Sequence, residues 1–385
     1  MNLLQLCLGS FYIDNYSYQE NLLPKYQKEC VDKIKIIASL VSFDENGKPC
    51  LLEKGSKYIN EHSIPVERLD YKKNLGKVGK ILRIYEKDLY SLLEEEKPDI
   101  IFVHGMQFWD INKVSHYARK HKDVILYVDN HADFSNSARG WVSKNILHKI
   151  LWKYCAKKIN PYVKKFYGVL PARVDFLRNV YGLPKEKIEL LVMGADDEKI
   201  QEAKAPEIRK EIREKHGIAD DDFLIMTGGK IDLFKTQTLL LMEAVNKINN
   251  PKVKLIVFGS VVPELKEKIA ALCSEKVQYI GWVQAVESYK YFASCDLAVF
   301  PGRHSVFWEQ VAGQGIPMVV KHWDGTTHID MDGNVKFLYN DSTDEIIEVL
   351  NETFVDIKQM KTVAEEKAYK FKYSDIAKKS IEWQE

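Results

Sequence analysis

Residues 297–310 read Leu-Ala-Val-Phe-Pro-Gly-Arg-His-Ser-Val-Phe-Trp-Glu-Gln, an apolar run followed by a turn and by the start of an amphipathic segment. The run 297–300 is typical of a buried β-strand, and Gly302 with its small polar neighbours forms a turn. Ser305 is a candidate N-cap for a helix that starts next. Because a strand that leads into a helix is the repeating unit of parallel α/β sheets, the segment predicts one such unit.

The same alternation extends along the chain in both directions. The apolar runs are continuous rather than alternating, which indicates parallel strands covered on both faces. Helical patterns separate the runs, for example at 78–95 and 236–246. We expect strands at residues 3–8, 34–40, 100–104, 124–129, 166–170, 188–193, 223–226, 253–258, 277–281, 297–300 and 318–320.

A polar stretch rich in both charges, residues 198–215, interrupts this alternation and indicates a linker that leads into a solvated helix. The sequence therefore predicts an α/β protein of two Rossmann-like doubly wound parallel-sheet domains that face a cleft. We expect the domains at residues 1–197 and 198–364, with a C-terminal helix at about 365–385 packed back on the first. Ligands of such sheets bind beyond the carboxyl ends of strands, so the loops after strands are the candidate sites.

The composition is globular, because apolar residues make up 45% and charged residues 29% of the 385 residues. A net charge of +1 argues against a dedicated nucleic-acid binder. The six cysteines are scattered without a Cys-x-x-Cys pair, which fits neither a zinc site nor a disulfide framework. The first residues lack the basic start of a signal peptide, and no run approaches about 18 apolar residues, so we expect a cytoplasmic protein.

The loop at residues 227–235 has the composition of a phosphate site. It reads Thr-Gly-Gly-Lys-Ile-Asp-Leu-Phe-Lys and precedes a predicted helix. Gly229 permits close backbone approach, and the ammonium groups of Lys230 and Lys235 would cradle a diphosphate together with backbone N–H groups. The segment is not a P-loop, because no Ser or Thr follows Lys230. The alternative is a tight turn with two solvated lysines.

The loop after residue 300 supplies a second set of candidate groups for binding a donor. If Ser305 caps the helix, the backbone N–H groups of Ser305 and Val306 would point at an anion. The carboxylate of Glu309 could accept two vicinal hydroxyls, as on a ribose, or simply favour the helix dipole. His304 is either a capping residue or a contact to a phosphate or sugar.

The loop after the predicted strand 124–129 carries Asp129, His131 and Asp133. These residues lack a metal-ligand spacing, so we predict no metal site and interpret them as acid–base or sugar-hydroxyl contacts. The alternative is that Asp133 or Ser135 caps the next helix.

Aromatic residues follow the first predicted strand. Gly9 ends that strand and is a candidate residue for binding the donor. Tyr16 and Tyr18 are interleaved with polar residues in the loop behind it. Such a loop suits stacking on a carbohydrate, here an acceptor or transferred sugar.

In their order and spacing these segments resemble the retaining glycosyltransferases of the GT-B fold, in the large family, family 4-like, that builds bacterial surface polysaccharides. The likeness covers most of the chain. It rests on the Gly9 loop, Val103-His104-Gly105, Asp129-Asn130-His131, Met193-Gly194-Ala195-Asp196, Gly229-Lys230 with Lys235, Tyr279-Ile280-Gly281-Trp282-Val283, and Cys295-Asp296-Leu297-Ala298-Val299-Phe300-Pro301 leading to Glu309 and Gly315-Ile316-Pro317.

The resemblance implies transfer of a hexose-type sugar from a nucleoside-diphosphate sugar, such as a UDP- or GDP-sugar, to a glycan or lipid-linked acceptor. Retention of configuration and a role in surface polysaccharide or glycoconjugate synthesis are implied with it. No cofactor or metal would be needed, because fixed cations stabilise the leaving group. In the implied roles, the two lysines neutralise the diphosphate, Glu309 holds the ribose, the backbone at Trp282 and Val283 reads the base, and His131 lies beside the transferred sugar.

One departure from the family pattern concerns the donor sugar. The family usually has two glutamates with seven residues between them, the first of which contacts that sugar. Counting back from Glu309 reaches Pro301, whereas alignment on the following Gly-Ile-Pro places Gln310 at the second glutamate position. The sugar-contacting carboxylate is therefore missing or supplied elsewhere, with His304 and Ser305 as candidates to take its place.

A basic helix is predicted in the first half. Residues 142–169 contain seven lysines and no Asp or Glu, and residues 72–83 form a second basic stretch. Basic amphipathic helices bind anionic membranes, which would place the protein peripherally on the inner face of a membrane. The alternative is a core-packed helix with a solvated basic face. The basic face carries Lys149, Lys153 and Lys157, and the apolar face carries Ile146, Leu147, Ile150, Leu151 and Tyr154.

Two other functions fit the sequence. A nucleotide-sugar 2-epimerase of the same fold would need more carboxylates and histidines around the sugar than this chain offers. A non-catalytic scaffold protein of the GT-B fold that docks on membranes would account for the missing first glutamate.

Overall fold

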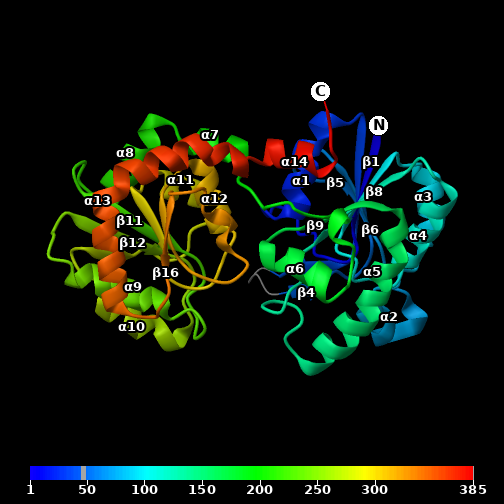
Figure 1. Ribbon diagram of the computed structural model, residues 1–385, viewed down its shortest axis with the longest axis horizontal. Helices are drawn as coiled ribbons and strands as arrows, with labels where there is room; N and C mark the ends of the chain where they lie inside the picture. Colours follow the sequence, from blue (N-terminus) through cyan, green and yellow to red (C-terminus); the bar gives the residue numbers. More distant parts are fainter. Residues whose placement is uncertain (45–48, 385) are drawn as a thin grey trace. The chain divides into compact units, whose positions relative to one another are not determined.

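The computed structural model describes residues 1–44 and 49–384, and the chain divides into two compact units (Figure 1). Unit 1 comprises Met1–Val192 and Ile376–Glu385, and unit 2 comprises Met193–Asp375. The division falls between residues 192 and 193, whereas the sequence placed it between 197 and 198. The reason is local: the N–H of Ala195 donates to Phe371 O at 2.7 Å, and that of Asp196 to Tyr289 Oη at 2.9 Å.

Unit 1 contains an eight-stranded sheet, counted over the described residues, in the order β10-β9-β8-β7-β1-β2-β6-β5. Its neighbouring strands run parallel except for β5 and β6. A separate antiparallel pair joins β3 and β4. The strands are β1 (Asn2–Cys7), β2 (Lys33–Ala38), β3 (Val41–Phe43), β4 (Pro49–Leu51), β5 (Lys57–Ile59), β6 (Pro65–Arg68), β7 (Ile100–His104), β8 (Ile125–Asn130), β9 (Val163–Gly168) and β10 (Ile188–Leu190).

Helices connect these strands, as parallel pairing requires. Leu92, Val114, Ala156 and Leu177, from four different helices, share one buried cluster with Leu6 of β1, so these helices cover the sheet. The helices of unit 1 are α1 (Gln19–Gln27), α2 (Gly76–Leu82), α3 (Leu89–Glu96), α4 (Ile111–Lys120), the π-helix η3 (Ser143–Trp152), α5 (Lys153–Ile159), α6 (Pro171–Asn179), and the short 3-10 turns η1 (Lys28–Cys30), η2 (Lys73–Leu75), η4 (Asn160–Tyr162) and η5 (Lys185–Lys187). The chain re-enters unit 1 within α14 (Tyr373–Ser380).

Unit 2 contains a six-stranded, wholly parallel sheet, again counted over the described residues, in the order β13-β12-β11-β14-β15-β16. The strands are β11 (Phe223–Gly228), β12 (Val253–Phe258), β13 (Val277–Tyr279), β14 (Leu297–Phe300), β15 (Met318–Lys321) and β16 (Val335–Leu338). The helices are α7 (Asp197–Ala203), α8 (Pro206–Lys215), α9 (Gln237–Lys247), α10 (Lys266–Leu272), α11 (Ser288–Ala293), α12 (Phe307–Gln314), α13 (Thr343–Lys367), and the 3-10 turns η6 (Pro263–Leu265), η7 (Thr327–Ile329) and η8 (Ala368–Phe371).

The predicted fold class is confirmed, because each unit is a parallel-sheet α/β layer structure and each predicted strand range overlaps an observed strand. The central strands are continuous apolar runs, and β7 is buried at all five positions. Five further strands, β3, β4, β5, β6 and β16, were not predicted. They are short or lie at a sheet edge, where the apolar signal is weak.

The predicted helix 78–95 is wrong, because two helices occupy this region. α2 ends at Leu82, and α3 starts at Leu89. Arg83, which follows α2, adopts a left-handed conformation with φ of 53°. Its guanidinium donates to Gly9 O at 2.6 Å and to Gln107 O, and these tertiary hydrogen bonds stabilise the left-handed conformation that ends α2.

The longest described helix is α13, with 25 residues of mixed apolar and charged character. No helix in the described part of the chain is both long and apolar enough to cross a membrane.

Candidate functional site

A pocket in unit 2 lies at the carboxyl ends of β11 and β14. Gly228 and Gly229 let the backbone turn there: a Cβ at Gly228 would stand 2.4 Å from the Phe258 ring, and Gly229 has φ of 128°. The pocket is lined by Thr227, Gly228, Gly229, Lys230, Ile231, Lys235, Thr238, Val257, Phe258, Phe300, Pro301, Gly302, Arg303 and Ser305. No acidic residue is among them. The structure therefore brings together the two loops that the sequence singled out.

Three cations line this pocket. Lys230 Nζ lies 3.6 Å from Asp232 Oδ2, whereas neither Lys235 nor Arg303 has a carboxylate within ion-pair distance in the described part of the chain. Burial lowers the pKa of Lys235, and the neighbouring Arg303 and Lys230 lower it further against the opposing effect of Asp232. The pocket thus concentrates positive charge that an anion would stabilise. The sequence pattern alone did not indicate a role for Arg303.

The start of α12 completes the pocket. Ser305 Oγ accepts a hydrogen bond from the N–H of Phe307 at 3.2 Å, so Ser305 stabilises the helix start, which lies at Phe307. Val306 is the N-cap residue and uses no side-chain capping bond. Because Ser305 O also accepts a hydrogen bond from the N–H of Trp308, the predicted contact with an anion depends on the N–H groups of Ser305 and Val306.

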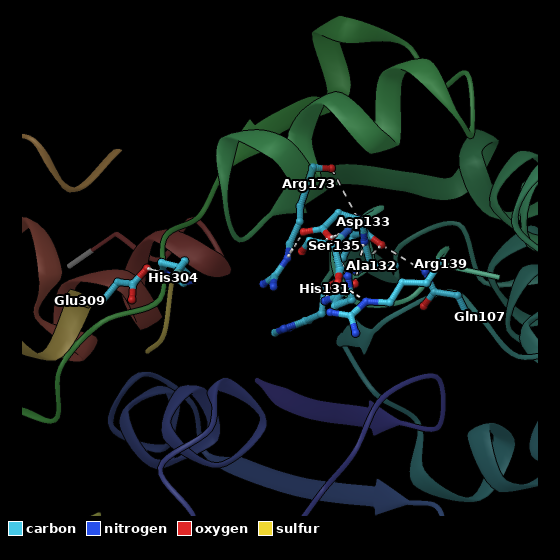
Figure 2. A network of polar contacts seen from close by, with 11 residues as sticks. Gln107, His131, Ala132, Asp133, Ser135, Arg139, Arg173, His304 and Glu309 are labelled. Carbon is cyan, nitrogen blue, oxygen red and sulfur yellow. Dashed lines mark hydrogen bonds and ion pairs between the residues drawn. The ribbon is translucent and has the colours of Figure 1, made fainter. Parts of the chain in front are cut away.

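Glu309 lies on α12 between two histidines. Its Oε1 atom is 2.8 Å from Nε2 of His304 and 2.8 Å from Nε2 of His328, which belongs to η7 (Figure 2 shows His304 beside Glu309). The carboxylate is completely buried. Burial opposes its charge, but the two imidazoles outweigh this effect and hold the pKa of Glu309 well below its usual range. A buried anion that holds two imidazoles is a rigid support for them.

Unpaired polar atoms surround this cluster. Within the described residues, Glu309 Oε2, His328 Nδ1 and Trp308 Nε1 are buried without a hydrogen-bond partner. Nε2 of both histidines and a carboxylate oxygen lie within 4.8 Å of one another, and His and Glu are zinc-ligand types. The 2.8 Å separations are hydrogen-bond lengths, so the cluster as it stands is a hydrogen-bonded triad. His328, which the sequence did not single out, lies in η7, seven residues after β15 ends at Lys321, so its position after a strand did not mark it.

In unit 1, Asp129 at the end of β8 links two histidines. Its Oδ2 atom lies 2.7 Å from Nδ1 of His104 and 3.2 Å from Nε2 of His131, and Gln19 Nε2 donates to the same oxygen at 3.1 Å. Asp129 has no exposed surface, so it supports His131 from inside rather than facing a ligand. Burial lowers the pKa of His131, but the carboxylates of Asp129 and Glu20 outweigh it and raise the pKa overall.

Asp133 is engaged in its own loop. Its Oδ1 atom accepts hydrogen bonds from the N–H groups of Ser135 at 2.6 Å and Asn136 at 3.1 Å. Its Oδ2 atom pairs with Nε of Arg173 at 3.2 Å, an ion pair that Figure 2 shows and that the sequence did not predict. Asp133 is buried and closes the turn at residues 134–137; it does not cap a helix, because the next helix, η3, begins only at Ser143.

Gly9, Tyr16 and Tyr18 lie on the loop after β1. A Cβ at Gly9 would stand 2.1 Å from Gly105 O, so only glycine lets the loops after β1 and β7 pass this closely. The rings of Tyr16 and Tyr18 stack at 5.3 Å, and Phe43 packs edge-on against both. The tyrosines thus form one aromatic cluster.

Trp282 and Val283 follow β13 in unit 2. Neither residue lines the pocket, and the Trp282 side chain is 68% exposed. Their loop is tied to the loop after β12, because Gly281 O accepts a hydrogen bond from the N–H of Gly259 at 2.7 Å.

Sequence comparison finds one family. Residues 222–354 match the family described as Glycosyl transferases group 1. The match includes both pocket loops and all three residues of the Glu309 triad. No curated protein matches the chain.

Solved structures of the same fold match nearly the whole chain. Alr3699/HepE from Anabaena in complex with UDP is 16% identical, with a TM-score of 0.66 over 98% of each chain. A glycosyltransferase from Rickettsia africae is 14% identical, with a TM-score of 0.68 over 99% of this chain and 97% of that one. UDP-GlcNAc 2-epimerase from Neisseria meningitidis bound to UDP-GlcNAc is 16% identical, with a TM-score of 0.61 over 99% of each chain.

Proposed function

We propose that this chain transfers a sugar from a nucleoside-diphosphate sugar to a glycan or lipid-linked acceptor. The proposal is supported by its GT-B fold and by the match of residues 222–354 to the glycosyl transferases group 1 family. The donor we propose is a UDP-sugar, because Alr3699/HepE binds UDP and UDP-glucose on the same fold. We propose a hexose as the sugar, retention as the stereochemistry, and surface polysaccharide or glycoconjugate synthesis as the role.

The observation that carries this proposal is the pocket lined by Lys230, Lys235 and Arg303 without an acidic residue. Of the three cations only Lys235 is partly buried, and it has no carboxylate partner among the described residues. A diphosphate would stabilise its charge through charge-assisted hydrogen bonds. The pKa of Lys235 is lowered first by burial, and the neighbouring Arg303 and Lys230 add to this effect. A diphosphate therefore fits the site in charge and in position at the carboxyl ends of parallel strands.

The same groups suit the departure of the nucleotide. As the bond between the sugar and the diphosphate breaks, negative charge grows on the leaving oxygen. The ammonium groups of Lys230 and Lys235, the Arg303 guanidinium and the N–H groups at Ser305 and Val306 would stabilise it. Because these fixed groups supply the positive charge, we propose a reaction that uses no metal or other cofactor.

We assign His304 to contact with the donor phosphate or sugar and Glu309 to holding His304 in place. The resemblance implied that Glu309 binds the ribose directly. In the structure, however, its Oε1 atom is taken by two imidazoles, and its side chain has no exposed surface. In our proposal Glu309 therefore acts through His304 and His328. Recognition of the base by the backbone at Trp282 and Val283 remains part of the proposal.

Unit 1 would supply the groups for the transferred sugar and the acceptor. We propose that His131, Tyr16 and Tyr18 contact sugar, because His131 is partly exposed and the tyrosines form an aromatic cluster. Asp129 and Asp133 would hold this part of the unit in shape, because both are buried and hydrogen-bonded within it.

Binding of UDP measured by calorimetry tests the proposal. Each of Lys235→Gln and Arg303→Gln should weaken UDP binding about tenfold or more, since each removes a charge-assisted contact. Lys266→Gln on α10, an exposed lysine that does not line the pocket, is the control and should bind UDP like the parent protein. Incubation with UDP- and GDP-sugars plus glycan or lipid-linked acceptors should then release the nucleotide. If no nucleoside diphosphate binds, both the transferase proposal and the pocket assignment fail.

A nucleotide-sugar 2-epimerase is the second candidate, because UDP-GlcNAc 2-epimerases are among the structural neighbours. An epimerase would convert a UDP-sugar to its 2-epimer with no acceptor present and with the sugar still attached to UDP. A transferase would instead release UDP only when acceptor is added. A chain that binds UDP yet does neither would fit the scaffold alternative.

A further inference from the structure

Large apolar side chains are exposed along the helix formed by η3 and α5. Val142, Ile146, Ile150 and Tyr154 are 57%, 43%, 65% and 48% exposed, and Trp141 just before them is 71% exposed. The sequence placed three of these residues on an apolar face that could pack in the core. Only part of that face does so: Leu147 and Leu151 pack against the core of unit 1.

The π-helical geometry of η3 explains why the exposed side chains form a stripe. Hydrogen bonds from residue i to i+5 widen the turn beyond 3.6 residues, so side chains four residues apart keep nearly the same direction. The exposed apolar residues from 142 to 154 follow this spacing of four. Lys149, Lys153 and Lys157 repeat at the same interval of four, with Lys149 and Lys153 each one position before Ile150 and Tyr154, and form a basic stripe beside the apolar one.

A second helix adds the same kind of residues. On α2, Val78 and Ile81 are 56% and 57% exposed. Residues 71–85 contain five basic residues and no acidic one, and Lys73, Lys77 and Lys80 are exposed.

Trp109 links the two helices in unit 1. The N–H of Trp109 donates to Leu82 O, at the end of α2, at 2.8 Å, and the Trp109 ring stacks on Tyr154 of α5 at 5.8 Å. Figure 1 places α2 and α5 at the same end of this unit. Their exposed apolar residues, Val78, Ile81, Trp141, Val142, Ile146, Ile150 and Tyr154, together with the surrounding lysines, are named here the basic apolar face.

We propose that the basic apolar face docks unit 1 on the surface of an anionic lipid bilayer. Its lysines match the negative headgroups, and residues 142–169 contain no carboxylate that would oppose them. The exposed isoleucines, valines and Trp141 would enter the boundary between headgroups and acyl chains, as the apolar side of an interfacial helix does. The apolar component distinguishes this partner from a nucleic acid, which would use the lysines and leave the isoleucines in water.

Sedimentation with vesicles tests the proposal without any enzymatic readout. The full chain should partition onto vesicles of phosphatidylglycerol and phosphatidylcholine much more strongly than onto phosphatidylcholine alone. Replacing Ile150 by Ser should lower the partition coefficient about tenfold, and Ile81→Ser should do likewise, because each removes a buried apolar side chain from the bound state. Ile59→Ser is the matched control: Ile59 is 63% exposed on β5 of the same unit and should bind like the parent chain.

The charge component is tested separately. The pair Lys80→Gln with Lys149→Gln should lower partitioning about 25-fold, at about fivefold per lysine. The pair Lys266→Gln with Lys268→Gln, exposed lysines of α10 in unit 2, makes the same change in net charge and should have no effect. Trp141→Ser tests the apolar component at a side chain that is 71% exposed. Because this replacement removes little packing from the folded protein, a loss of vesicle binding cannot be attributed to unfolding.

Three results would overturn the proposal. The first is that the Ile150→Ser, Ile81→Ser and Trp141→Ser variants bind vesicles as strongly as the parent chain. The second is that the parent chain binds neutral and anionic vesicles equally. The third is that it binds duplex nucleic acid in a salt-sensitive way and does not bind vesicles.

Discussion

Nε2 of His304 lies 2.8 Å from Oε1 of Glu309, the same oxygen that Nε2 of His328 approaches at 2.8 Å. A single buried carboxylate oxygen thus orients two imidazoles, one on the loop next to the cationic pocket and one on η7. This arrangement separates two roles for Glu309 that the sequence alone could not distinguish: direct binding of a ribose, and support of His304.

Glu309→Gln should weaken UDP binding about tenfold while leaving the affinity for uridine unchanged. The amide keeps the shape of the side chain but removes the charge that orients the histidines, and His304 acts on the phosphate part of the ligand. Calorimetry with both ligands provides the measurement. A large loss of uridine affinity would instead show that Glu309 holds the ribose, and our assignment would be wrong.

Binding of UDP should weaken at alkaline pH because Lys235 loses its proton there. Burial lowers the pKa of Lys235 from 10.5, so its ammonium is lost at lower pH than that of an ordinary lysine. The charged form binds the diphosphate, and affinity therefore falls as pH rises through this lowered pKa. Lys235→Arg keeps its charge at every accessible pH and should shift the decline to higher pH. An identical decline in both proteins would rule out Lys235 as its cause.

The fold was predictable where continuous apolar runs marked the buried strands, as at 100–104, 253–258 and 297–300. The break in the helix at Arg83 was not, because it depends on hydrogen bonds to Gly9 and Gln107, which are distant in sequence.

The candidate site was predictable only in part. The loops with Lys230, Lys235 and His304 follow strands, a position that sequence patterns reveal. His104 and Asp129 face each other because β7 and β8 pair in that register, and register cannot be deduced from one sequence. For the same reason, the sequence predicted that Asp129 and His131 both face a ligand, whereas in the structure Asp129 is buried and forms a hydrogen bond with His131.

Asp129→Asn should destabilise unit 1 by about 3–5 kcal/mol, because it removes a buried charge that two histidines share. The pKa of His131 should fall as well, since the carboxylates raise it. Because the pKa of His131 is higher in the folded than in the unfolded chain, protonated His131 stabilises the folded state at pH values below its unfolded pKa. This stabilisation is lost as the pH rises through the pKa of His131 in the folded state. Urea unfolding and NMR titration of the imidazoles provide the two readouts. Asp123→Asn, at an exposed position before β8, is the control and should change neither.

The C-terminal segment should detach more easily in Glu382→Gln. Glu382 accepts a hydrogen bond from Tyr127 Oη at 2.9 Å and pairs with Lys164 and Lys165 at 2.6 and 2.9 Å. Burial opposes its charge, but these partners lower its pKa to about 2. The stabilisation is therefore present above its usual pKa of 4.5 and is lost as pH falls toward 2. Amide exchange of α14 should be faster in the variant at pH 7, and the difference from the parent chain should vanish near pH 2.

Gly9→Ala should destabilise unit 1 by about 1–3 kcal/mol, because the new methyl group would meet Gly105 O at 2.1 Å and force two strand-end loops apart. Gly140→Ala is the matched control: no atom lies within 4 Å of its added Cβ, so stability should stay the same or rise by less than about 1 kcal/mol. Urea unfolding of both variants provides the comparison. Because Arg83 binds Gly9 O and holds the end of α2, Gly9→Ala should also speed amide exchange in α2. Equal stability of the two variants would mean that the loops can separate freely, and the close approach at Gly9 would then have no role in shaping unit 1.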